Sequence, residues 1–188
     1  MERSFLEVKR LSEKLDYDGS QLNPHWTYKS TGIMGDAAVS FIGACNIPDE
    51  QIADIEDILD KQKIKADIML HFIVEVFGRD CLFGALLQTV FISEIQSELL
   101  LHKVDVQRKG DDLFVAEGKL SISIATASCV STLIHIGLNI SNEGTPVKTA
   151  CLSDYGIDPV GFSLKVLQRF NKEFSRIILA SSKVKARI

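Results

Sequence analysis

The sequence predicts an α+β fold: a mainly antiparallel sheet with helices packed on one of its faces. Residues 119–125 alternate strictly between apolar and polar side chains, residues 133–141 alternate again, and in 67–77 one side is purely apolar while the other holds His71 and Glu75. A strand sends successive side chains to opposite faces, so each stretch has one apolar and one polar side. Residues 82–102 and 159–180 carry apolar residues at helical spacing, as in helices that cover such a sheet.

The apolar sides of these strands define the expected core. In 119–125 that side consists of Leu120, Ile122 and Ile124, with Lys119 and Ser121 on the other. We expect the two long helices to pack on one set of side chains: Leu120, Ile122, Ile134, Ile136 and Leu138. If a strand were shifted by one residue, its polar side chains would face the helices instead, so this expectation has no intermediate outcome.

Composition limits the kind of protein. The 188 residues, 46% hydrophobic and 24% charged, suit one domain spanning residues 1–188. A net charge of −4 with scattered basic residues argues against a nucleic-acid partner. No apolar run approaches the roughly 18 residues of a membrane helix, and no secretory signal is recognisable, so we expect a cytoplasmic protein without a membrane partner. Four widely spaced cysteines without a CxxC pair favour reduced thiols over a metal site or disulfides.

The remaining elements are short. The first 45 residues predict an edge strand at 5–8, a turn region at 16–23 and a helix at 24–30. A glycine-bearing loop at 31–36 and a strand at 37–45 follow. The glycine-bearing loop is compatible with a phosphate-binding nest and is more typical of a plain turn.

Three further elements complete the expected order. Residues 47–63 predict a surface helix in a crossover connection, because acidic residues load its early turns, where the helix dipole favours them. Short strands are expected at 104–107 and 112–116. Asp158 and Pro159 are typical of the N-cap and first position of the final helix.

The polar sides of the strands gather the residues that can carry chemistry. If the apolar sides share one core, the polar sides share the other face. We expect one concave ligand site, lined by Lys119, Ser121, His135, Asn139, His71 and Glu75. Gly137 would leave room there for a flat ring or an acyl chain.

Within that site we expect Glu75 to be ionised beside Lys119, and a histidine to carry protons near neutral pH. Plainer interpretations stay open for each residue. A half-polar antiparallel sheet is often simply solvated. A strand histidine such as His71 is commonly a hydrogen-bonded core residue, Lys119 follows a glycine turn, and Asp112 lies in a turn.

The order of these elements resembles the catalytic domain of the biotin and lipoate protein ligases, whose core is shared with class II aminoacyl-tRNA synthetases. The resemblance lies mainly in residues 82–174. The run KGDDLFVAEGKLSISIA resembles the ligase pattern Lys-Trp-Pro-Asn-Asp-Leu, strand, Gly-x-Lys-Leu-x-Gly-Ile. HIGLNISNEG resembles Ile-Gly-x-Gly-Ile-Asn-Val-Asn. Lys119, Asp112, Gly137 and Asn139 match these patterns.

The whole chain also resembles a small, mainly archaeal family of uncharacterised proteins that is placed with the ligase fold. The shared stretches are Tyr-Asp-Gly-Ser at Tyr17–Ser20, the strand His71–Phe77, and Asn-Glu-Gly-Thr-Pro at Asn142–Pro146. The fold also implies, by analogy, a homodimer.

The ligase resemblance implies activation of a small carboxylic acid with ATP and magnesium. Lys119 would stand beside the developing acyl phosphate, and Asp112 would bind magnesium or fix Lys119. The sequence departs from the ligases before strand 67–77, where their Gly/Arg-rich adenylate loop is replaced by the acidic segment 47–63. Asp111, Ser121 and His135 replace Asn, Gly and Gly of the ligase patterns.

These departures favour a second hypothesis, a non-catalytic module that keeps the pocket for a small metabolite, a nucleotide or an acyl group. A third hypothesis is hydrolysis by His71 or His135 with Glu75 or Glu143, but no Ser-His-Asp or GxSxG pattern supports it.

Overall fold

A five-stranded sheet with the order β1-β2-β3-β8-β7 organises the computed structural model, which describes residues 4–145 and 147–185. Its strands are β1 (Glu7–Lys14), β2 (Ala37–Asn46), β3 (Lys65–Phe77), β7 (Ser121–Ala127) and β8 (Ser131–Asn139). Strands β1 and β2 run parallel; the other neighbours are antiparallel, as expected. The expected edge strand at 5–8 is longer and begins two residues later.

A second, smaller sheet has the order β4-β5-β6 and follows the first long helix in the chain. Its strands are β4 (Val106–Lys109), β5 (Asp112–Val115) and β6 (Gly118–Lys119). Strand β6 ends one residue before β7 of the large sheet begins, so the two sheets are joined through a single residue, Leu120.

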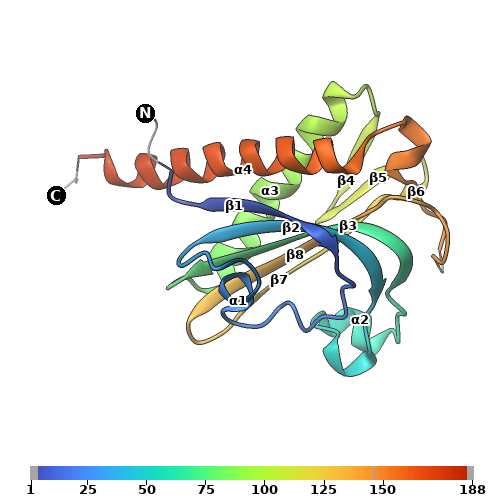
Figure 1. Ribbon diagram of the computed structural model, residues 1–188, viewed down its shortest axis with the longest axis horizontal. Helices are drawn as coiled ribbons and strands as arrows, with labels where there is room; N and C mark the ends of the chain where they lie inside the picture. The colour runs from blue at the N-terminus through green and yellow to red at the C-terminus, as the bar shows by residue number, and fades with distance from the viewer. Residues whose placement is uncertain (1–3, 146, 186–188) are drawn as a thin grey trace.

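Two long helices, α3 (Cys81–Leu101) and α4 (Pro159–Ser182), cover one face of the large sheet (Figure 1). The Asp80 side chain accepts a hydrogen bond from the Phe83 N–H and caps α3. Asp158 caps α4 in the same way, with Pro159 at the first position, as the sequence predicted. No helix within residues 4–145 and 147–185 is long and apolar enough to cross a membrane.

The main core lies between these helices and the sheet. Phe91 of α3 stacks on Phe170 of α4, with ring centroids 4.0 Å apart. The strands contribute the predicted apolar sides: Leu70, Phe72, Val74 and Val76 from β3, and Ile134, Ile136 and Leu138 from β8. Alternation in β3 and β8 therefore identified the buried face correctly.

The opposite face of the sheet carries short elements (Figure 1). They are α1 (Trp26–Thr31), a 3₁₀ turn η1 (Asp49–Gln51) and α2 (Ile55–Leu59); a further 3₁₀ turn, η2 (Leu152–Tyr155), precedes α4. A second apolar cluster lies under them: Tyr17, Phe41, Cys45, Ala66, Met69 and Ile73.

The segment 47–63 differs from its prediction in two ways. It is not one helix, because Ile52 between η1 and α2 has extended backbone and is buried. It is not a crossover connection either, since β2 and β3 are antiparallel neighbours and the segment simply joins their adjacent ends.

The expected faces of 119–125 are wrong from Ser121 onward. Ser121 pairs with Leu138 and Ile122 with Gly137, and directly paired residues share a face. Ser121 therefore faces the helices, while Ile122 packs on the second cluster. The alternation is interrupted at Leu120, where the chain passes from β6 to β7, and a shift of one residue exchanges the two faces.

Candidate functional site

A cavity of about 440 Å³ opens on the sheet face that the long helices leave free. One wall is the connection between β2 and β3, and another is formed by the small sheet and β7. One part of the cavity is lined by Tyr17, Cys45, Met69 and Ile122, which are part of the second cluster or packed against it. His135, stacked on Tyr17, lines the same part. Charged side chains line another part, so the cavity has an apolar inner region and a charged mouth.

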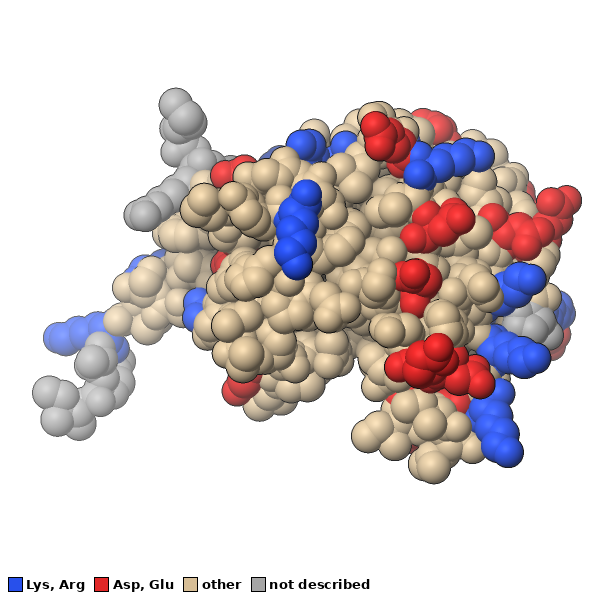
Figure 2. Space-filling model, turned by 60° about the horizontal axis from the view of Figure 1, so that its bottom comes forward, with Lys and Arg blue, Asp and Glu red and all other residues tan. Residues whose placement is uncertain are grey.

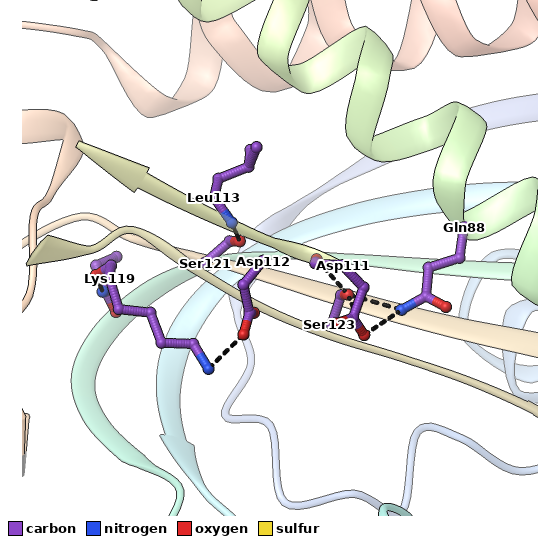
Figure 3. Close-up of polar contacts among 8 residues, drawn as sticks. Gln88, Asp111, Asp112, Leu113, Lys119, Ser121 and Ser123 are labelled. Atoms are coloured by element: carbon purple, nitrogen blue, oxygen red, sulfur yellow. Dashed lines mark hydrogen bonds and ion pairs between the residues drawn. The ribbon is translucent and has the colours of Figure 1, made fainter. Parts of the chain in front are cut away.

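Lys119 and Asp112 form an ion pair at this mouth, with 2.6 Å between Lys119 Nζ and Asp112 Oδ2 (Figure 3). Lys119 pairs with Phe114 in the small sheet, and its N–H donates to the carbonyl of Lys148. Burial raises the pKa of the Asp112 carboxyl, and the neighbouring Lys119 opposes that rise. The structure thus pairs Asp112 with Lys119, and its role in fixing Lys119 or binding magnesium stays a prediction.

Asp111 lies beside this pair and belongs to a hydrogen-bonded group that the sequence did not predict. The Gln88 side-chain amide of α3 donates to Asp111 Oδ2 at 3.1 Å and to Ser123 Oγ at 2.7 Å (Figure 3). Ser123 Oγ in turn donates to the Asp111 carbonyl at 2.8 Å. This group ties the small sheet to α3 and so holds the turn that precedes Asp112, the first residue of β5.

The mouth of the cavity is more acidic than basic. Figure 2 brings the underside of Figure 1 forward and shows acidic side chains gathered near lysines toward the α2 end of the molecule. The acidic residues that line the cavity are Asp54, Glu56, Asp57, Asp111 and Asp112, against Lys63, Lys65 and Lys119. Burial and the nearby Asp54 raise the pKa of Asp57. Within the described residues, no three His, Cys, Asp or Glu side chains are grouped closely enough to hold a metal ion.

The inner region contains a stack of buried rings. The Tyr17 ring lies flat on His135, with centroids 3.6 Å apart and planes 9° apart. His71 lies next to both, and Phe41 stacks on His71 at 5.0 Å. Tyr17 and His135 line the cavity, whereas His71 is fully buried behind them.

The two histidines form a hydrogen-bonded chain. His71 Nε2 lies 3.3 Å from the carbonyl oxygen of Gly43, and His71 Nδ1 lies 3.0 Å from His135 Nε2. Burial lowers the pKa of His71 to about 4, and burial together with His71 holds the pKa of His135 well below its usual range. Both shifts favour neutral rings at pH 7 and so argue against the expected proton carrier near neutral pH.

Tyr17 reaches this position because its chain segment runs parallel to β2 and bridges to Cys45. Tyr17 N–H donates to the Ala44 carbonyl, and the Asn46 N–H donates to the Tyr17 carbonyl. Gly43 is required at this close approach, since a Cβ there would lie 2.0 Å from the Leu15 carbonyl oxygen. The Asp18 side chain accepts from Ser20 N–H and Oγ–H and forms the turn that follows.

Four of the six residues expected in one concavity are among those that line it: Lys119, His135 and Asn139, and also Ser121, whose side chain faces the helices. Ser121 is largely occupied elsewhere, because its Oγ accepts from the buried Leu113 N–H at 2.8 Å. Asn139 donates its amide hydrogens to the carbonyls of Lys119 and Ala150, at 3.0 and 3.3 Å. Asn139 thus holds β6 against the large sheet.

Gly137 and Glu75 do not line the cavity. The space beside Gly137 is filled by Met69, Ile122 and His135, whose atoms lie 2.9 to 3.4 Å from where a Cβ would stand. It is therefore not room for a ligand.

Glu75 is fully buried under α1, away from Lys119. It accepts hydrogen bonds from the His25 N–H, Thr27 Oγ1 and Ser131 Oγ, at 2.6, 2.7 and 2.9 Å. The expectation that Glu75 is ionised beside Lys119 is wrong, because Glu75 lies further along β3, where it anchors α1.

Two other hypotheses find no support in the geometry. Within the described residues, the hydrogen bonds of the His71 and His135 rings go to each other and to Gly43, not to Glu75 or Glu143, so no acid–histidine pair for hydrolysis is formed. The loop at 31–36, considered as a phosphate nest, does not line the cavity.

The stretches Tyr17–Ser20 and His71–Phe77, and residues 142–145 of the third stretch, contribute residues to the cavity or to the rings behind it. Tyr17 and Thr145 line the cavity, and His71 supports His135. Asn142 accepts from Thr149 Oγ1 at 3.0 Å, and Thr149 also lines the cavity. Pro146 lies outside the described residues.

Comparison with solved structures defines the fold class. A mutant biotin protein ligase from Aquifex aeolicus, in complex with biotin, aligns with a TM-score of 0.60 and 16% identity, over 92% of this chain and 71% of the ligase. The putative lipoate protein ligase Ta0514 from T. acidophilum, with bound lipoic acid, aligns with a TM-score of 0.59 and 13% identity, over 90% and 85%. The protein has the biotin/lipoate ligase fold, which is class II synthetase-like.

The chain belongs to the family described as "Domain of unknown function (DUF366)", which matches residues 6–185. A protein of unknown function from Pyrococcus horikoshi aligns with a TM-score of 0.94 and 38% identity, over 97% of this chain and 100% of that one. The uncharacterised protein MJ0805 from Methanocaldococcus jannaschii is 29% identical over 180 residues, 92% of this chain and 81% of the relative. The expected archaeal family is thus confirmed.

Proposed function

We propose that this protein binds a small carboxylate, acyl or nucleotide ligand in the cavity, with Lys119 contacting the ligand's anionic group. The observation that carries the proposal is the position of Lys119 at the mouth of a cavity whose inner region is uncharged. A ligand with an anionic end and a neutral end matches this polarity.

Asp112 supports this assignment rather than opposing it. It neutralises Lys119 when the cavity holds no ligand, yet burial raises its own pKa. A carboxylate next to a half-buried aspartate with a raised pKa can share the Lys119 ammonium, because the aspartate takes up a proton more readily than an exposed one. The fold neighbours described as holding biotin and lipoic acid are consistent with a small carboxylate ligand.

ATP-dependent activation of that carboxylate is the second candidate, and Lys119 favours it. An ammonium beside a developing acyl phosphate stabilises negative charge in the transition state. The acidic mouth opposes it, since ATP would bring further negative charge toward five carboxylates. Binding without catalysis is therefore the alternative that this mouth favours, and Lys119 is the residue to test in both cases.

Thermal unfolding with candidate ligands tests the proposal, because a ligand that binds the native state raises Tm. The panel is biotin, lipoate, a fatty acid, amino acids, and ATP with magnesium. We expect one carboxylate or nucleotide to raise Tm, and Lys119→Ala to abolish most of the shift. Lys148→Ala is the matched control, because Lys148 pairs with Glu117 at 2.8 Å and does not line the cavity. A panel without any shift would contradict the proposal.

Isotope exchange between pyrophosphate and ATP separates binding from activation. If the protein adenylates its acid, exchange depends on that acid and is lost in Lys119→Ala but kept in Lys148→Ala. If the protein only binds, no exchange occurs in any of the three proteins, although the ligand still raises Tm of the unaltered chain.

We further propose that the chain works as one domain in the cytoplasm and forms a homodimer. Its four cysteines are free thiols, in keeping with a reducing compartment. Leu82 and Leu86, one turn apart on α3, are 70% and 60% exposed and would suit a contact between copies. Light scattering should give about twice the 20.8 kDa of one chain. A mass of one chain at high concentration would contradict the dimer.

A further inference from the structure

The buried histidine pair has a defined arrangement of hydrogens. A carbonyl oxygen only accepts hydrogen bonds, so His71 Nε2, 3.3 Å from the Gly43 oxygen, carries the hydrogen. The neutral ring of His71 then has a bare Nδ1, which accepts from His135 Nε2 at 3.0 Å. His135 is also neutral, so its own Nδ1 is left without a hydrogen. The Gly43 carbonyl thereby sets the tautomer of both histidines.

His135 Nδ1 is thus a bare acceptor. Within the described residues it has no hydrogen-bond partner, although His135 is only 1% exposed and lines the cavity. This nitrogen keeps some exposed surface, and His135 is one of the residues that line the cavity. The ring cannot easily turn to another partner, because Tyr17 lies flat against it at 3.6 Å.

A hydrogen bond to this nitrogen would be important because the surrounding side chains are apolar. Cys45, Met69 and Ile122 line the same region, so a ligand placed there displaces water from an apolar wall. A hydrogen bond formed in such surroundings is stronger than one in water, and an acceptor left unpaired under a ligand is costly.

We propose that His135 Nδ1 selects the ligand by accepting a hydrogen bond from an uncharged N–H or O–H group at the ligand's inner end. This rests on the proposed function, and it names the class of ligand for the same cavity: a small acid or acyl compound whose far end is a lactam, cyclic amide or similar donor-bearing ring. A ligand that ends in plain hydrocarbon, such as a fatty acid, leaves the nitrogen unpaired and binds less tightly. A lipoate-type dithiolane ring has no N–H or O–H donor and belongs to this weaker class.

The test uses the five-membered lactam pyrrolidinone and its N-methyl derivative as probes. They share the ring and the carbonyl, but only the first has an N–H to donate. The full chain, labelled at its histidines, is observed in proton–nitrogen correlation spectra, where a bare and a hydrogen-bonded ring nitrogen differ. We expect the lactam to shift the His135 Nδ1 signal and to bind about tenfold more tightly than the N-methyl compound, the size of one buried hydrogen bond.

Two variants sharpen the result. His135→Phe keeps a ring against Tyr17 and removes the acceptor, so it should lose the preference for the lactam. His71→Gln can still accept from His135 and donate to Gly43, so it should keep the preference. Should His135→Phe not fold, the comparison of the two probes on the unaltered chain decides. Equal binding of both probes, or no response to the lactam, would overturn the proposal.

Lys119→Ala separates this proposal from the proposed function. The lactam has no anionic group, so its effect on His135 should persist in Lys119→Ala. If carboxylates fail to bind while the lactam preference holds, the role of Lys119 is wrong and that of His135 stands.

Discussion

The two faces of the large sheet are stabilised in different ways. The face under α3 and α4 is filled by apolar side chains, with Phe91 stacked on Phe170 at its centre. The opposite face has a smaller apolar cluster and buries polar groups beside it, among them His71, His135 and Glu75. The first face contributes mainly burial of apolar area, whereas the second depends on each buried polar atom finding a partner.

This difference explains where the cavity lies. A face packed by two long helices leaves no room for a ligand, because protein interiors are close-packed. The face covered by short segments is incompletely filled, and a bare buried acceptor, His135 Nδ1, is at the cavity wall. Polar atoms inside a core are costly to leave unpaired, so this is also where a ligand gains most by pairing them.

The largest expected effect is a loss of stability on replacing an isoleucine, and it is compared between the two faces of the sheet. Ile136→Ala removes a fully buried side chain from the main core, and should lower the free energy of unfolding by about 3 kcal/mol. Ile122→Ala removes a half-buried side chain at the cavity, and should cost about 1 kcal/mol. Urea unfolding monitored by circular dichroism measures both. Equal losses would mean that the two faces are packed alike.

Much of the fold could be predicted because alternation and helix signals are local. In β3 every second residue from Leu70 to Val76 is apolar, as is every second residue from Ile134 to Leu138 in β8, and these faces were assigned correctly. Asp80 and Asp158 cap the two long helices through their own side chains. The face of Ile122 was assigned wrongly, because the step between two sheets at Leu120 depends on a distant partner, Leu113, whose carbonyl accepts from Leu120.

The second prediction concerns the loss of folding stability at acidic pH. Burial lowers the pKa of folded His71 to about 4, against about 6.5 in the unfolded chain. Between these values the unfolded chain binds more protons, so the native state loses stability as pH falls from about 6.5 to 4. The loss from His71 is about 3 kcal/mol by pH 4, and His135 adds to it.

The difference between two pH profiles isolates this effect. The double variant His71→Gln/His135→Phe lacks both histidines but keeps Asp36 and Asp112, whose pKa values burial raises and whose contributions have the opposite sign. Urea unfolding should show a steeper loss between pH 6.5 and 4 for the unaltered chain than for the double variant. Parallel profiles would show that the histidines are not held neutral.

The site was less predictable than the fold because it depends on contacts between distant segments. Lys119 and Asp112 were found through the ligase resemblance, and His135 through its place on a polar strand side. Tyr17 was noticed only as part of a turn, since nothing local shows that it stacks on His135 across 118 positions of sequence. Glu75 was placed on the correct face, but the sequence does not show that α1 covers it.

The smallest expected effect tests the shifted register of β7. Ser121 was expected to bind ligand, but its Oγ accepts from the buried Leu113 N–H at 2.8 Å. Ser121→Ala leaves that N–H without a partner and should lower the free energy of unfolding by about 1 kcal/mol. Ser181→Ala is the matched control, because Ser181 Oγ is exposed and donates to Ile178 within its own helix, where its loss should be nearly neutral. Any ligand found in the thermal screen should raise Tm of Ser121→Ala as much as that of the unaltered chain. If Ser121→Ala instead keeps its stability and loses the ligand, Ser121 faces the cavity as alternation alone predicts, and the register of β7 is wrong.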